Sequence, residues 1–240
     1  VTSIQNGYLT LAYLSDIELY YSGPQEPVNE FIILSGEERD HLVKVMRHSL
    51  GEEIFITNGL GKIFKAVIEK IFKDSIEAKV IETYSYINKK KNYTFCIPRL
   101  KNPERFEFAL EKCAELGITD FLIFNSSRTI SKGTRIDRWN KILISAMKQS
   151  LLSFLPAVHT ADSINEINIE QGEKLVFDQS GKKKFLKNLL KDEKKYFFIF
   201  GPEGGFTKEE LNLFNENYII NIGENRLRTE TAVIKCASLL

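Results

Sequence analysis

Two segments near the end of the chain combine glycine with charged and hydroxyl side chains, as ligand sites do. Residues 200–207 read FGPEGGFT, and residues 223–232 read GENRLRTETA. Glycines let a ligand approach the main chain closely, and a turn that joins a strand to a helix leaves backbone N–H groups free. In open α/β sheets, ligands bind at such turns. The two segments are therefore candidates for one binding site.

The elements around these segments are predicted from the flanking residues. Residues 196–200 are short, apolar and rich in aromatic residues, which favours a buried strand, and residues 218–222 favour a second one. Thr207 and Glu210 have the spacing of a capping box, so a helix is expected to start there. A last helix should bury one face, formed by Val233, Ile234, Ala237 and Leu240. Alone, the first segment would fit a plain tight turn equally well, and the second segment favours a site.

The pair GPEGGFTKEEL and RLRTETA, with one strand between, resembles the SPOUT class of methyltransferases. More closely it resembles the ribosomal RNA small-subunit methyltransferase E family, the 16S rRNA uracil-N3 methyltransferases. The resemblance implies S-adenosylmethionine as cofactor and a deep trefoil knot over residues 196–240. No metal is expected, because the cysteines and His41, His48 and His159 lack metal-ligand spacing. The resemblance also implies that these residues bind the cofactor: Phe200, Gly201, Pro202, Gly204, Gly205, Ile222, Gly223, Leu227, Thr229 and Ala232.

Methyl transfer to uracil N3 depends mostly on positioning and on stabilising charge. Uracil N3–H is a weak acid, so a cation near its anion would help. Arg228 is the expected catalytic cation. Glu203 is expected to act either as the general base or as the group that orients Arg228. Glu230, close by in the sequence, could instead cap the helix or pair inside the knot.

The order of the remaining elements predicts two domains. Residues 1–86 contain three strand-like runs broken by turn residues, and they look like the family's PUA-like RNA-binding domain, a small β-barrel. Residues 87–240 alternate strands and helices, which predicts an α/β domain with a parallel sheet and helices on both faces. The family match identifies this second part as the SPOUT methyltransferase domain.

Four basic residues match positions where the family contacts RNA. Arg47 falls in an HxxKVxR pattern, Lys101 precedes the helix KNPERFEFALEKCAELG, and Arg128 and Lys132 lie in NSSRTISK. The expected partner is RNA phosphate. This sequence has Ser127 where the family usually has Glu. Any role that the family assigns to that carboxylate is therefore not expected here.

Local signals also predict helix ends. Ser35 and Glu38 have capping-box spacing. Asn102 and Pro103 fit the start of a helix that ends at Gly117, and residues 182–191 have the pattern of a basic amphipathic helix.

Composition narrows the class of protein. The chain has 240 residues, is 43% hydrophobic and 27% charged, and contains no apolar run near the ~18 residues of a membrane span. Residues 1–86 carry 8 Lys and Arg against 13 Asp and Glu, whereas the rest carries 25 against 19, which suits a polyanionic partner. The chain opens with no signal-peptide pattern, and its three cysteines are far apart. We therefore expect reduced thiols and a cytoplasmic protein without a membrane partner.

Other functions fit less well. A phosphate-binding P-loop is rejected because GPEGGFT lacks the G-K-[S/T] ending. A non-catalytic RNA-binding relic and a SPOUT enzyme acting on another RNA nucleotide remain alternatives. The family acts as a homodimer on 16S rRNA or the small ribosomal subunit, so both partners are expected here.

Overall fold

The computed structural model describes residues 17–129, 133–185, 187–191 and 193–240. They form two compact units. The first contains the described residues up to Asn88 together with Met147–Leu155, and the second contains Lys89–Ala146 and Pro156–Leu240. Within the described ranges, no helix combines the length and the apolar composition needed to cross a bilayer.

The first unit is built on a five-stranded sheet in the order β1-β3-β4-β5-β2. β1 runs parallel to β3, and the other neighbours are antiparallel. Its core is made of side chains that alternate along the strands, such as Ile54, Ile56, Phe64 and Ile76. The strands are β1 (Leu19–Tyr21), β2 (Phe31–Ser35), β3 (Glu53–Thr57), β4 (Lys62–Ile71) and β5 (Ser75–Ser85).

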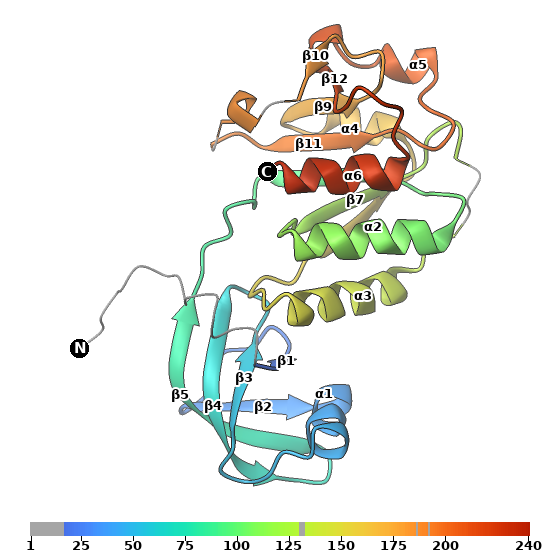
Figure 1. Ribbon diagram of the computed structural model, residues 1–240. Coiled ribbons are helices and arrows are strands. Elements are labelled where there is room, and N and C mark those ends of the chain that lie inside the picture. Colours follow the sequence, from blue (N-terminus) through green and yellow to red (C-terminus); the bar gives the residue numbers. More distant parts are fainter. Residues whose placement is uncertain (1–16, 130–132, 186, 192) are drawn as a thin grey trace. The chain divides into compact units, whose positions relative to one another are not determined.

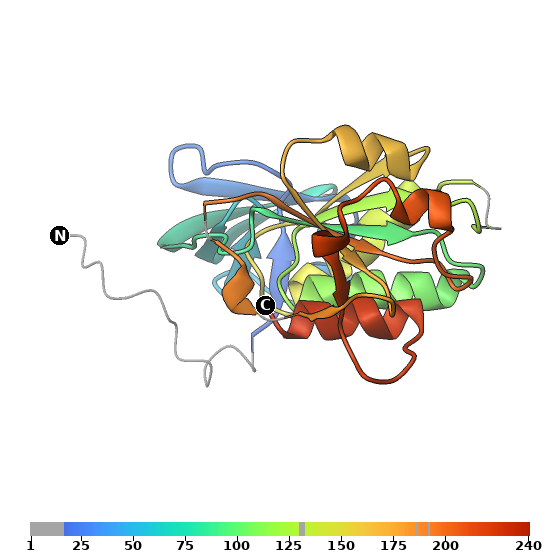
Figure 2. The same ribbon diagram turned by 90° about the horizontal axis from the view of Figure 1, so that it is seen from above.

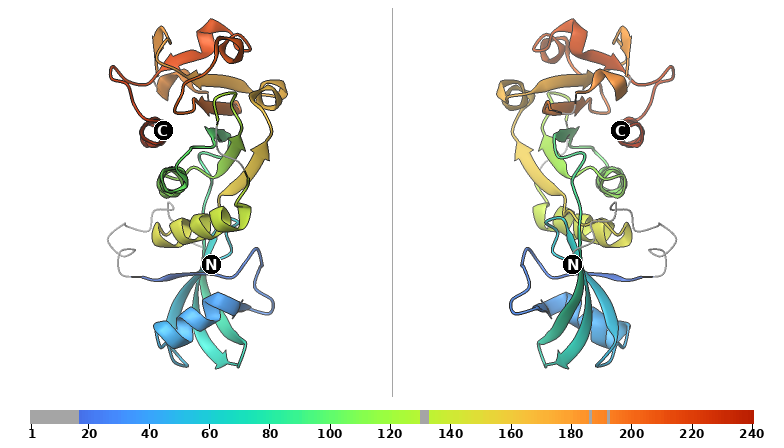
Figure 3. Two further views of the ribbon diagram at one scale, coloured as in Figure 1. Left: turned by 90° about the vertical axis from the view of Figure 1, so that its right-hand side faces the viewer. Right: turned by 90° about the vertical axis from the view of Figure 1, so that its left-hand side faces the viewer.

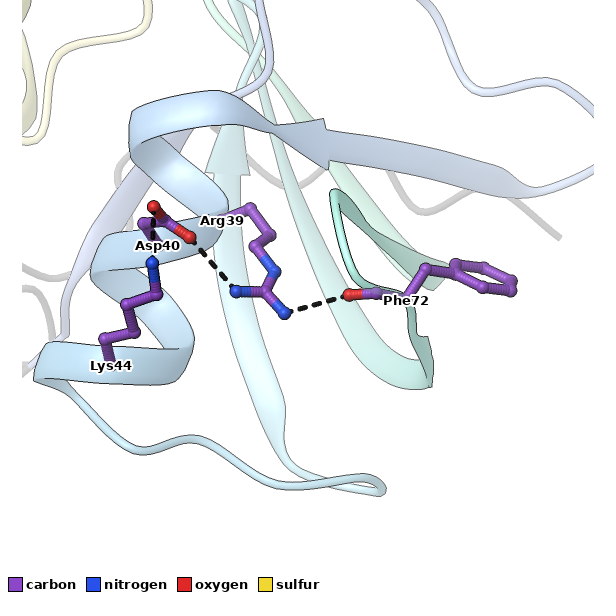
Figure 4. Close-up of polar contacts among 4 residues, drawn as sticks. All are labelled: Arg39, Asp40, Lys44 and Phe72. Atoms are coloured by element: carbon purple, nitrogen blue, oxygen red, sulfur yellow. Dashed lines mark hydrogen bonds and ion pairs between the residues drawn. The ribbon is translucent and has the colours of Figure 1, made fainter.

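One short helix, α1 (Gly36–Asp40), continues into a π-helical turn, His41–Val45, and packs beside these strands (Figure 3). Arg39 ties it to the turn between β4 and β5, because its Nη2 donates to the Phe72 carbonyl at 2.9 Å while its Nη1 contacts Asp40 (Figure 4). Lys44 and Arg39, which hydrogen-bond to Asp40, hold the pKa of its carboxyl below its usual range.

The predicted capping box at Ser35 does not form. Ser35 occupies the N-cap position, but its side chain accepts no hydrogen bond. The Glu38 carboxylate instead accepts from the Tyr21 N–H at 3.1 Å and from Lys148 Nζ at 2.6 Å. Partners distant in the sequence thus compete successfully for the carboxylate that the local pattern assigns to the cap.

Lys148 belongs to the segment Met147–Leu155, which returns to the first unit after the chain has entered the second. There Gly61 N–H donates to the Ser153 carbonyl, and Leu155 N–H donates to the Gly59 carbonyl. The sequence analysis did not anticipate this return.

The second unit contains a seven-stranded sheet whose neighbours are all parallel, in the order β10-β12-β9-β11-β6-β7-β8. This confirms the predicted α/β fold with a parallel sheet. The strands are β6 (Tyr93–Pro98), β7 (Asp120–Phe124), β8 (Ala157–Ala161), β9 (Glu173–Phe177), β10 (Lys183–Lys184), β11 (Tyr196–Phe200) and β12 (Ile219–Asn221).

Helices cover both faces of this sheet (Figures 1 and 2). One core joins the sheet to Phe106 of α2, Trp139 of α3 and Val233 of α6; the other joins it to Ile167 of α4 and Leu211 of α5. The helices are α2 (Pro103–Glu115), α3 (Ile136–Gln149), α4 (Ile164–Ile169), α5 (Lys208–Leu211) and α6 (Thr229–Ser238).

The local signals in this unit are mostly confirmed. The Asn102 side chain caps α2 by accepting from Glu104 N–H and Arg105 N–H, and Gly117 follows the helix at φ +84°. The predicted helix at 182–191 is wrong. Lys183 and Lys184 form an edge strand paired with β12, and Phe185 N–H donates to the Asn221 carbonyl, so backbone pairing with the sheet replaces the helix there. Later in the segment, Lys187–Leu189 form a single short 3-10 helix.

The three cysteines, Cys96, Cys113 and Cys236, are buried free thiols, as predicted. Burial raises the pKa of each thiol. They therefore stay protonated near neutral pH and lack the thiolate that a nucleophile needs.

Candidate active site

The carboxyl ends of three adjacent strands, β12, β9 and β11, open into one cavity of about 570 Å³. This volume falls within the range of small-molecule sites, roughly 300–1,000 Å³. The two segments singled out in the sequence both line it, as predicted. The lining includes the two residues expected to be catalytic and all ten expected to bind cofactor: Arg228, Glu203, Phe200, Gly201, Pro202, Gly204, Gly205, Ile222, Gly223, Leu227, Thr229 and Ala232.

Part of the cavity wall comes from residues outside the two motif segments. β9 lies between β11 and β12 in the sheet, so the residues at its end, Phe177, Asp178 and Gln179, also line the cavity. Arg105 reaches it from the first turn of α2. No motif marks these residues, because the order of strands in a sheet depends on pairings between segments far apart in the sequence. A polar DQS triplet directly after a buried strand was the available signal.

Hydrogen bonds and glycine geometry fix the loop at 201–205. Thr229 Oγ1, at the start of α6, donates to the Gly201 carbonyl at 2.8 Å and so joins the two motif segments directly. Gly205 has φ +70°, a value that favours glycine, and its N–H closes a turn on the Pro202 carbonyl. A Cβ on Gly201 would lie 3.2 Å from the Phe206 ring. These contacts hold the loop in one defined conformation.

Neighbouring loops hold the outer side of the same turn. Glu203 Oε2 accepts from the Lys101 N–H at 3.1 Å, and Arg128 Nη1 donates to the Gly204 carbonyl at 2.6 Å. Two side chains for which the sequence predicts catalysis and RNA binding therefore also position the glycine-rich loop.

A buried carboxylate connects this loop to the next. Glu210 completes the predicted capping box with Thr207, and its Oε1 also accepts from Ser126 Oγ at 2.7 Å and Ser127 N–H at 2.8 Å. Burial raises the pKa of Glu210, but hydrogen bonds from Thr207, Ser127 and Ser126 outweigh it, so the pKa lies below its usual value. Glu210 is therefore a charged anchor between the two loops.

Charged groups of opposite sign meet on the cavity wall. Glu230 Oε1 lies 3.8 Å from Arg105 Nε and 4.0 Å from Arg228 Nη1. The Glu230 side chain is only 12% exposed, whereas that of Arg228 is 67% exposed. The arginine that the sequence marks as catalytic is therefore accessible and has a carboxylate behind it.

The residues expected to contact RNA lie in different settings. Arg128 and Lys101 are exposed beside the glycine-rich loop, and Arg47 is exposed in the first unit at φ +59°. Lys132 lies outside the described residues. In the part of the chain that the structure describes, no group of three His, Cys, Asp or Glu side chains is arranged to hold a metal ion.

Two family models match the chain. One, described as RNA methyltransferase domain, matches residues 88–240, and another, described as RNA methyltransferase PUA domain, matches residues 34–81. The chain belongs to this RNA methyltransferase family. Its two matched segments confirm the PUA-like first part and the family resemblance drawn from the motifs.

Relatives of this RNA methyltransferase share one name. "Ribosomal RNA small subunit methyltransferase E" of Bacillus subtilis is 26% identical over 225 residues, covering 86% of this chain and 88% of the relative. The protein of that name from Buchnera aphidicola is 28% identical over 254 residues, covering 100% and 95%.

A solved structure extends the comparison. The ribosomal RNA small subunit methyltransferase E of Neisseria gonorrhoeae, bound to S-adenosyl methionine, is 26% identical, with a TM-score of 0.80 over 92% of this chain and 95% of that one. At this coverage, the likeness includes residues of both units of this chain.

Proposed function

We propose that this RNA methyltransferase transfers a methyl group from S-adenosylmethionine to N3 of a uracil in 16S ribosomal RNA. The observation that carries the proposal is the single cavity that both motif segments line. The name of the relatives supports a small-subunit ribosomal RNA substrate, and the Neisseria structure supports the cofactor. The choice of uracil N3 rests on the family resemblance of the motifs.

The cavity suits S-adenosylmethionine in size and in chemistry. Apolar side chains of Pro202, Ile222 and Leu227 offer a surface for an adenine ring, and the backbone of the glycine-rich loop offers hydrogen-bonding groups next to them. Asp178 and Gln179 add polar side chains. When bound, the cofactor supplies an electrophilic methyl group on a sulfonium. The chain holds that group and the base in line.

In the proposed reaction, a bond forms between N3 and the methyl carbon, the bond from that carbon to sulfur breaks, and N3 loses its proton. Arg228 stabilises the negative charge that develops on the uracil ring. Glu203 is the proposed proton acceptor or the group that orients Arg228. Its Oε2 accepts from the Lys101 N–H, which leaves Oε1 to take the N3 proton. If Glu203 orients Arg228 instead, the proton passes to water.

RNA contacts are proposed for four residues. Lys101 and Arg128 border the glycine-rich loop, where they would meet the phosphates next to the target base. Arg47 would contact RNA from the PUA-like part. For Lys132, which lies outside the described residues, the proposal rests on the match of NSSRTISK to the family. Because bacterial ribosomes are assembled in the cytoplasm, a ribosomal substrate implies that the protein works there.

We also propose that residues 87–240 form a SPOUT domain with a trefoil knot in residues 196–240. The chain leaves β9, forms β10 on the outer side of β12, and returns to β11 on the other side of β9. β12 and α6 then follow, which supports threading of the tail through that loop. A knotted chain pulled from both ends would stop short of the ~3.3–3.6 Å per residue that an open chain reaches.

The decisive experiment incubates the protein and labelled S-adenosylmethionine with small ribosomal subunits from cells that lack this methyltransferase. The modified base is then mapped. Label on uracil N3 of 16S rRNA is expected. Label on another nucleotide would favour a different SPOUT specificity. Absence of label together with absence of cofactor binding in titration calorimetry would favour the non-catalytic alternative.

A further inference from the structure

The strongest unexplained feature of the cavity is the group Arg105, Glu230 and Arg228. Arg105 comes from the first turn of α2, and Glu230 from the first turn of α6. Both arginines approach the same Glu230 oxygen, Oε1, at 3.8 and 4.0 Å. Of these three residues, the proposed reaction uses only Arg228. Arg105 and Glu230 therefore have no role in it so far.

The contacts in this group are loose. Both distances exceed those of hydrogen bonds, which end near 3.2 Å for N–H···O. Among the described residues, Glu230 Oε2 is buried without a hydrogen-bond partner. The side chains of Arg105 and Arg228 remain 42% and 67% exposed. The guanidinium groups thus keep N–H donors for a ligand, while the carboxylate is held inside the wall.

A second pair in the same unit shows the contrast. Arg138 on α3 forms two hydrogen bonds of 2.6 Å with the buried Glu107 on α2, using both carboxylate oxygens. That arrangement satisfies the carboxylate fully and raises the pKa of Arg138. The group at Glu230 lacks such hydrogen bonds: its distances are longer, and Glu230 Oε2 has no partner among the described residues.

Two guanidinium groups and one carboxylate leave one net positive charge on the cavity wall. A nucleotide brings one negative charge on its phosphodiester, and guanidinium groups bind phosphate oxygens with paired N–H groups. We propose that Arg105 binds a backbone phosphate of the target nucleotide, and that Glu230 is a positioning residue that sets the spacing between Arg105 and the catalytic Arg228. This inference rests on the proposed function and extends it to a phosphate subsite.

A simpler account is available. Glu230 lies in the first turn of α6, where an acidic residue stabilises a helix by a few tenths of a kcal/mol to about 1 kcal/mol. An exposed ion pair adds a similarly small amount, about 0–1 kcal/mol, to the free energy of unfolding. On that account Arg105 has no contact with RNA. The two accounts differ in how RNA binding depends on salt.

The first test measures the affinity for a small-subunit ribosomal RNA transcript at several salt concentrations. Loss of one phosphate contact reduces the slope of log K against log salt by about 0.7 for single-stranded RNA. Arg105→Gln should show this reduction and a raised KM for RNA. Arg138→Gln is the matched control, since it also removes an arginine paired with a glutamate, and its slope should equal that of the wild type. An unchanged slope for Arg105→Gln would overturn the phosphate contact.

The second test uses Glu230→Gln, which adds one net positive charge to the cavity. Electrostatics alone expects tighter RNA binding and unchanged turnover. The positioning role expects kcat to fall about 10- to 100-fold while RNA affinity holds or rises, because the arginines lose their spacing. S-adenosylmethionine affinity, measured by calorimetry, should stay within about threefold. Unchanged kcat, or loss of cofactor binding that accounts for the decrease, would overturn the positioning role.

These outcomes are separate from the fate of the proposed function. If wild-type protein fails to methylate small subunits, the proposed function fails whatever the variants do. If the wild type is active and Arg105→Gln keeps its salt slope, only the phosphate subsite fails.

Discussion

Arg228 is the residue on which the proposed chemistry depends most. It sits at the N-cap of α6, lines the cavity, and keeps 67% of its side chain exposed. Arg228→Ala should therefore abolish methyl transfer while changing the free energy of unfolding by no more than about 0.5 kcal/mol, as for other surface substitutions. Methyl transfer to small subunits measures the activity, and thermal unfolding measures the stability. Cofactor titration shows whether the variant still binds S-adenosylmethionine. Turnover like that of the wild type would exclude the catalytic role.

Glu210 controls how the glycine-rich loop is anchored. Its two oxygens accept three hydrogen bonds, one from the N-cap residue Thr207 and two from Ser126 and Ser127, so Glu210→Gln must turn an N–H₂ donor toward one of these donors. We expect a loss of about 1–3 kcal/mol in the free energy of unfolding at neutral pH. The exposed neighbour gives the control variant, Glu209→Gln, which should have a smaller effect.

The same residue gives a pH dependence of defined sign. Because the folded-state pKa of Glu210 is depressed, its contribution is present above its unfolded pKa, about 4.3, and is lost as the pH falls through the lower folded pKa. The stability difference between wild type and Glu210→Gln should shrink in that acidic range. Denaturant unfolding at several pH values measures it. A difference that stays constant down to pH 2 would contradict the charged anchor.

Individual cavity residues could be predicted well where a motif carried them. The two segments and the adjoining Ile222 contain all twelve residues expected to bind cofactor or catalyse, because the paired motifs resemble those of a known family, and all twelve line the cavity. Arg105 was missed because nothing in the pattern of α2 distinguishes a cavity arginine from a surface one. The distinction depends on Glu230, which lies more than a hundred residues further along the chain.

At the level of elements, β12 and the loop after β9 approach unusually closely. A Cβ on Gly181 would lie 2.7 Å from both Asn221 N and Ile220 C, which are backbone atoms and cannot move aside as a side chain would. Gly181→Ala should therefore cost about 1–3 kcal/mol. It should also weaken cofactor binding, because Asn221, Ile222 and Gly223 line the cavity.

A matched variant separates crowding from backbone conformation. Gly51 has φ +85° and nothing within 4 Å of an added Cβ, so Gly51→Ala tests conformational strain alone. Unfolding and cofactor titration of both variants make the comparison. Intact cofactor affinity in Gly181→Ala would show that the close approach does not shape the cavity.

The elements also show what sequence patterns can predict. β11 and the N-cap of α2 were predicted at the right residues, since buried aromatic runs and Asn-Pro starts are local signals. The segment at 182–191 was predicted as a helix from its spacing alone. Its real partner is the edge of β12, and that partner is determined by the order of the whole sheet. Long-range pairing overrides a weak local preference.

At the scale of the whole molecule, assembly into a homodimer remains a proposal, and apolar side chains on two adjacent helices suggest where it occurs. α2 packs against α6. Phe108 on α2, Leu116 directly after α2 and Leu239 directly after α6 are 50%, 37% and 44% exposed. If these helices form the interface, an aspartate at Phe108 would be buried there without a partner. We therefore expect the wild type to be dimeric in light scattering and Phe108→Asp to be monomeric.

The chain offers a closely matched control for this experiment. Phe72 is 49% exposed in the turn between β4 and β5, and its ring points away from Arg39 (Figure 4). Phe72→Asp makes the same chemical change on the PUA-like unit. Its molar mass in light scattering should equal that of the wild-type dimer. Since a dimer is stabilised by mass action, the Tm of the wild type and of Phe72→Asp should rise with protein concentration, and that of Phe108→Asp should not. A wild type that is monomeric at every concentration would rule out this interface. A dimeric Phe108→Asp would also rule it out, because burial of an unpaired aspartate in an apolar contact would dissociate the dimer.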